Sequence, residues 1–129
     1  MDEFTITVPP ERQYAAVPGL VLGGIAARHE LTLDALDDLQ LALESLLAGA
    51  DDSDDVTIVL QVDGGTISAA VGPLAAATAG ELEREADETL GLRRLLDAVV
   101  DGMTLRERDG ATWVELRKEF ELEGTEAGR

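Results

Sequence analysis

The residues best placed for chemistry lie on one predicted helix, from about Thr32 to Ala50. Ser45 and Gly49 lie about one turn apart on one side of it. If that side lines a site, it offers a hydroxyl group and a bare backbone position. Glu44 is the neighbouring carboxylate, but one residue corresponds to about 100° around a helix, so Glu44 points elsewhere. The opposite side is apolar at helical spacing and is expected to face the core; it comprises Leu36, Leu39, Leu43, Leu46 and Leu47.

Other catalytic or metal-binding sets have little support. The chain has no Cys, which excludes disulfides, thiolate metal sites and Cys nucleophiles. The single His, His29, cannot build a His-based metal site alone, and no base is in register for a hydrolase triad. The acidic run Asp51–Asp55 lacks the glycine and the distal Glu of an EF-hand, so we expect a solvated loop. Scattered Asp and Glu residues could pair for acid–base work, but nothing fixes such a pair. We predict no metal site.

The charge of the chain limits its partners. The formal net charge is −17, from 27 acidic and 10 basic residues. Nucleic acids and anionic membranes attract basic surfaces, so we expect neither as a partner. Solubility alone or salt adaptation of the host accounts for the acid excess. The first residues lack the regions of a signal peptide, and the apolar run near Val17 to Ala27 is too short to span a bilayer. We expect a cytoplasmic protein.

Residue patterns predict the elements that hold these residues. Phe4–Val8 alternates as a strand and ends at Pro9-Pro10. A helix follows from Glu11 to about Glu30, in which Pro18 marks either a kink or the true start. Thr32 is the expected N-cap of the next helix.

Two predicted hairpins and a third helix complete the chain. The first hairpin pairs Val56–Val62 with Thr66–Val71 around Asp63-Gly64-Gly65, and a loop or short helix covers Leu74–Glu85. A helix over Asp87–Asp101 precedes the second hairpin, Met103–Arg108 and Thr112–Leu122 around Asp109-Gly110, with Val114, Leu116 and Phe120 facing the core. These elements predict one domain over residues 1–129. It is an α+β two-layer sandwich with a mostly antiparallel sheet covered on one face by helices.

Several stretches occur in an order that is typical of one family. They are the opening strand Phe4–Pro10, the run Thr32–Glu44, the segment Leu90–Asp101 and the closing Asp109-Gly110 hairpin. Together with the element order, they resemble the ATPase domain of the histidine-kinase type, the GHKL or Bergerat fold, over residues 4–122. The small anti-sigma-factor serine kinases of bacterial partner-switching systems are the most similar in pattern.

The resemblance implies a nucleotide site whose first motif is altered here. In the family, a Glu positions or activates the attacking group, and an Asn four residues later holds Mg²⁺. The aligned positions are Ser45 and Gly49. An alignment shifted by one residue places Glu44 at the Glu position, but its partner is then Ala48, which is no metal ligand.

The other two motifs and the segment between them are altered as well. The Asp-x-Gly motif that reads adenine corresponds to Ala70-Val71-Gly72, which keeps only the glycine. The glycine-rich motif that approaches phosphate corresponds to Thr89-Leu90-Gly91-Leu92, which keeps one glycine. The intervening segment carries Glu81, Glu83 and Glu85, which repel a triphosphate. The resemblance therefore implies vestigial catalytic positions at Glu44 and Ser45, and a vestigial nucleotide site at Ser45, Gly49, Gly72 and Gly91, with no cofactor, neither ATP nor Mg²⁺.

This resemblance implies a regulatory protein without catalysis, a pseudokinase that acts in transcription or stress signalling. Its expected partners are a sigma factor or an anti-sigma antagonist, and a homodimer is expected because the family commonly dimerises. The alternative is an active ATP-dependent serine/threonine kinase of such a system that uses displaced residues such as Glu44. A binding module of unrelated purpose on the same fold is a third hypothesis.

Overall fold

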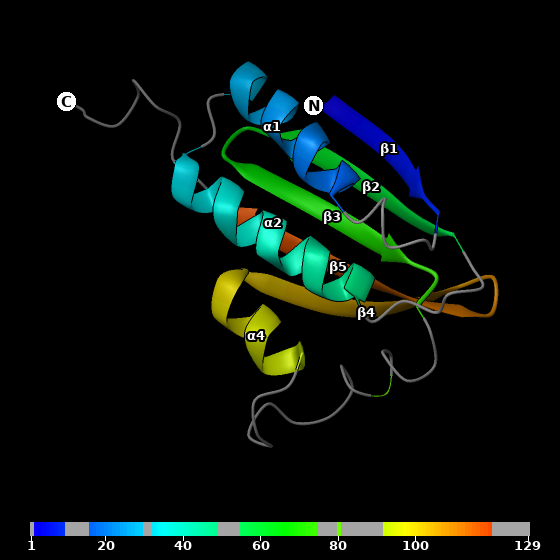
Figure 1. The fold of residues 1–129 in the computed structure, drawn as a ribbon. Coiled ribbons are helices and arrows are strands. Elements are labelled where there is room, and N and C mark those ends of the chain that lie inside the picture. Colours follow the sequence, from blue (N-terminus) through cyan, green and yellow to red (C-terminus); the bar gives the residue numbers. More distant parts are fainter. Residues whose placement is uncertain are drawn as a thin grey trace.

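The computed structural model describes residues 2–9, 16–29, 32–48, 55–74, 80 and 92–119. Its elements are β1 (Asp2–Val8), α1 (Val17–His29), α2 (Leu33–Ala48), β2 (Val56–Asp63), β3 (Thr66–Gly72), α4 (Leu92–Val99), β4 (Gly102–Arg108) and β5 (Ala111–Glu119). All strand pairs are antiparallel, in the order β1-β2-β3-β5-β4. Figure 1 shows α1, α2 and α4 on the same face of this sheet. The described chain is a two-layer α+β sandwich, which confirms the fold class predicted from the sequence.

The core lies between the helices and the inner face of the sheet. Every second strand residue points under the helices, because side chains alternate along a strand. The inward apolar residues of the three central strands are fully or almost fully buried, and include Ile58, Leu60, Val62, Ile67, Ala69, Val71, Val114 and Leu116. Three leucines of α2 complete this layer with exposures of 0–2%: Leu39, Leu43 and Leu46. The predicted apolar face of α2 and the inward positions of β5 at Val114 and Leu116 are therefore confirmed.

Local chemistry sets where the helices begin. Thr32 caps α2: its Oγ1 accepts a hydrogen bond from the Ala35 N–H at 3.2 Å, and its carbonyl accepts one from the Leu36 N–H at 3.1 Å. This confirms the predicted N-cap. The helix α1 begins at Val17, so Pro18 lies in its first turn, where a missing N–H breaks no helical bond. Pro18 therefore marks the start of the helix, and no kink is needed.

The hairpins turn where the sequence predicts. Gly64 has φ of 62°, and Asp109 and Gly110 have φ of 53° and 81°, values that two-residue hairpin turns require. The helix α4 ends at Val99, two residues before the predicted end. It stops because the Asp101 N–H donates to the Arg117 carbonyl of β5 at 2.8 Å instead of continuing the helix.

Several predicted features lie outside the described residues. They are the start of the first helix before residue 16, the acidic residues 51–54, the segments 75–79 and 81–91, and residues 120–129 with Phe120.

Candidate functional site

The predicted site helix, α2, turns one flank toward α4. Asp38 lies on this flank, because its carboxylate is joined through Lys118 to the carbonyl of Val99, the last residue of α4. Ser45 follows Asp38 by seven residues, which brings it back to the same side of α2 about two turns further on. Its side chain is half-buried. The position implied to bear the catalytic carboxylate therefore carries a small hydroxyl on the α4 side of the helix.

Glu44 points to the other side of α2. Its Oε2 accepts a hydrogen bond from Nε2 of Gln40, one turn earlier, at 3.1 Å. Gln40 packs against α1, since a Cβ built on Gly19 would lie 2.8 Å from Gln40 Nε2. Glu44 thus belongs to the α1 side of the helix layer, away from the flank that carries Ser45. The side chains of Glu44 and Ser45, the two positions that the resemblance implies to be vestigial, therefore point to different flanks of α2.

Of the three glycines of the implied nucleotide site, the structure describes only Gly72. Gly49 and Gly91 lie outside the described residues. Gly72 is the last residue of β3 and is buried. A methyl group there would overlap the indole ring of Trp113 on β5. The close approach of Trp113 gives Gly72 a packing role on the helix-free side of the sheet.

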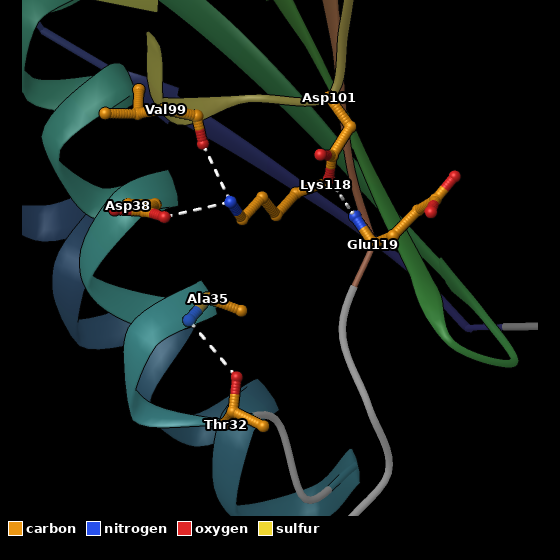
Figure 2. A network of polar contacts seen from close by, with 7 residues as sticks. All are labelled: Thr32, Ala35, Asp38, Val99, Asp101, Lys118 and Glu119. Carbon is orange, nitrogen blue, oxygen red and sulfur yellow. Dashed lines mark hydrogen bonds and ion pairs between the residues drawn. The ribbon is translucent and has the colours of Figure 1, made fainter.

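A polar network joins the helix layer to β5 beside the Ser45 flank (Figure 2). Lys118 lies on β5 with its side chain 15% exposed, and Nζ donates to Asp38 Oδ2 and to the Val99 carbonyl, both at 2.9 Å. The bond to Val99 satisfies a carbonyl at the C-terminus of α4, where a cation is also favoured by the helix dipole. One ammonium group therefore links α2, α4 and the sheet.

The next residues continue this network along the α4–β4 connection. Asp101 Oδ2 accepts the backbone N–H of Glu119 at 2.7 Å, and Figure 2 shows this bond beside Lys118. These contacts hold a turn in place, and two of the three N–H groups of Lys118 Nζ are used within the network. Their arrangement supports a structural role. The sequence contained a sign of it: Lys118 continues the inward alternation of Val114 and Leu116, so a charged group at that position requires a buried partner.

A second feature lies on the opposite face of the sheet and was not predicted. There, Val59, Ser68, Ala70 and Arg117 are among the residues that line a hollow with a volume of about 440 Å³.

Among the described residues, no group of three or more His, Cys, Asp or Glu side chains could hold a metal ion. No helix in this part of the chain is long and apolar enough to cross a membrane.

No protein-family model matches the chain, and no curated protein matches it significantly.

Proposed function

We propose that this protein is a non-catalytic relative of the anti-sigma-factor serine kinases that regulates by binding another protein. The observation that carries the proposal is the α2 flank facing α4, which presents Ser45 where the family carries its Glu. The carboxylate on the same flank, Asp38, lies about two turns away and is bound by Nζ of Lys118 at 2.9 Å. A kinase of this type needs a carboxylate and a metal-binding amide on that flank. The order of the described elements, β1-α1-α2-β2-β3-α4-β4-β5, supports the relationship because it matches the order expected for the family.

The proposed partner is a sigma factor or an anti-sigma antagonist in the cytoplasm of a bacterium, and the proposed assembly is a homodimer. An active kinase that uses Glu44 would need this carboxylate to leave Gln40 and to reach the other flank of α2. The hydrogen bond from Gln40 to Glu44 supports the proposed non-catalytic function over the active kinase. A serine/threonine kinase activity is therefore the competing outcome of the test.

The proposal is tested by affinity capture from the host, with identification of the retained proteins by mass spectrometry. We expect a sigma factor or an antagonist of the anti-sigma type, bound equally well with and without Mg-ATP. Purified partner and [γ-³²P]ATP then test for phosphate transfer, which we expect to be absent. Retention of neither class of partner would overturn the assignment, and transfer of phosphate to the partner would establish the kinase instead.

A further inference from the structure

The helix-free face of the sheet is hollowed along β3. Two cross-strand rows form this region, Gln61–Ser68–Arg117 and Val59–Ala70–Glu115. In both rows a short side chain of β3 lies between longer side chains of β2 and β5. The short residues leave the hollow of about 440 Å³ between them. Its volume falls in the range of small-molecule pockets, about 300–1,000 Å³.

Arg108 lines the hollow and is held in place by Trp113. Its guanidinium carbon lies 4.8 Å from the centroid of the indole ring, a cation–π contact. The ring is itself fixed against Gly72, where no side chain could fit. A guanidinium group that is held by a ring face keeps its N–H donors free to bind a ligand. Arg108 is thus pre-positioned at the hollow.

The carboxylate next to Arg108 is already engaged by another residue. Glu115 Oε1 lies 2.8 Å from Nε of Arg106, whereas its Oε2 lies 3.6 Å from Arg108, beyond hydrogen-bond distance. Two guanidinium groups therefore share one carboxylate, and Arg108 is the less satisfied of the two.

A second guanidinium group, that of Arg117, lines the same hollow. It is positioned by the carboxylate of Glu119 and by the carbonyl of Asp101. These contacts use two of the five N–H donors of Arg117. Counted with Arg106 and Arg108, the face of β4 and β5 carries three Arg against Glu115 and Glu119. This is a net charge of +1 on the face of these two strands, in a chain of net charge −17; the carboxylate of Glu3, on the β1 side of the same face, is bound by Gln61.

We propose that this hollow binds a small organic anion through a carboxylate or phosphate group held by Arg108 and Arg117. Ser68 supplies a further hydroxyl donor in the hollow, and Gln61, whose Nε2 already donates to Oε1 of Glu3 at 2.9 Å, has one amide N–H left. A long polyanion is disfavoured because it would extend over the acidic remainder of the surface. A small anion contacts the Arg groups directly, while charges more than about 8 Å away are largely screened at physiological salt. The site goes beyond the proposed regulatory function and lies on the other face of the sheet from Ser45.

Trp113 provides the test, because it is the only Trp of the chain and contacts Arg108. Sodium succinate and sodium phosphate are titrated separately into the full chain, with NaCl keeping the ionic strength constant. We expect a saturable change in Trp113 emission with at least one of them, and the identity of that anion distinguishes a carboxylate site from a phosphate site. The absence of a saturable change with both anions would overturn the proposal.

Variants place the binding at this hollow. Arg108→Gln and Arg117→Gln should each raise the dissociation constant of the anion at least tenfold. Isothermal titration calorimetry measures it, because Arg108→Gln also alters the fluorescence of Trp113. The control is Arg28→Gln on the exposed surface of α1, which should bind as the unchanged chain does. Circular dichroism confirms that the variants are folded. Binding that survives both substitutions would show that the anion binds elsewhere and would overturn the assignment.

Discussion

Lys118 and Asp38 join the last strand to the second helix across 80 residues of sequence, with Nζ of Lys118 donating to Oδ2 of Asp38 at 2.9 Å. The same Nζ donates to the carbonyl of Val99 at the end of α4. The lysine side chain is 15% exposed and the aspartate side chain 40% exposed, so this ion pair is more protected from water than a surface pair. Removal of one partner should therefore cost more stability than breaking an exposed pair, because the other charged group is left without its partner in a site with little water.

Removal of the ammonium group should destabilise the fold. Lys118→Met keeps an unbranched side chain of similar length but leaves Asp38 and the Val99 carbonyl without their donor. We expect the free energy of unfolding to fall by about 1–3 kcal/mol. Urea denaturation measures it, and a double-mutant cycle with Asp38→Ala should give a coupling energy of about 0.5–3 kcal/mol.

The matched control for the Lys118–Asp38 pair is an exposed ion pair. Arg28→Gln breaks the ion pair of Arg28 with Asp2, whose atoms are 3.8 Å apart and whose side chains are 67% and 37% exposed. The change in stability should stay within about 0.5 kcal/mol. If Lys118→Met proved as stable as the unchanged chain, the linking role of Lys118 would be wrong.

Gly72 should not tolerate even a methyl group while Trp113 is present. The Cβ of Gly72→Ala would overlap atoms of the indole ring, so we expect a loss of about 1–3 kcal/mol from overpacking. The same substitution in a Trp113→Ala background should cost much less, because the ring is gone. Thermal denaturation of the four proteins gives the comparison. Equal losses in both backgrounds would show that the glycine is required for another reason.

Two exposed glycines of α1 should be replaceable with a gain in stability. Gly23 and Gly24 lie inside the helix, and nothing approaches within 4 Å of a Cβ built on either. Gly→Ala at each position should raise the free energy of unfolding by about 0.5–1 kcal/mol, because alanine restricts the unfolded chain and favours the helix. Gly64→Ala is the contrasting variant: its φ of 62° disfavours a side chain, so it should lose stability. A loss of stability in the Gly23→Ala and Gly24→Ala variants would instead indicate that this surface of α1 is covered by other residues in solution.

The elements could be predicted because their signals are local. Thr32 caps α2 through a bond to a residue three positions away, and the turns at Gly64 and Asp109-Gly110 depend on their own backbone angles. The sheet order could not be predicted, since the placement of β5 between β3 and β4 depends on contacts between distant segments. The same holds for Trp113 against Gly72 and for Lys118 against Asp38. In each case two residues far apart in sequence meet only in the folded chain.

For the candidate site, the sequence could predict the helix but not the contacts of its side chains. The helix that carries Glu44 and Ser45 is present, but sequence spacing alone could not say that Gln40 holds Glu44 on the α1 side. The hollow on the other face depends on short residues of β3 lying between long residues of two other strands. No linear motif records that arrangement.

Nucleotide binding tests the central claim most directly. The melting temperature of the full chain is measured against Mg-ATP up to millimolar concentrations, with ATP alone, MgCl₂ alone and NaCl at equal ionic strength as controls. A nucleotide at 100 times its Kd would add about 2.7 kcal/mol of stability and a clear rise in melting temperature. We predict a melting temperature with Mg-ATP that is no higher than with ATP alone, because binding of phosphate groups by Arg108 and Arg117 needs no Mg²⁺. A concentration-dependent rise that requires both Mg²⁺ and ATP would contradict the non-catalytic account.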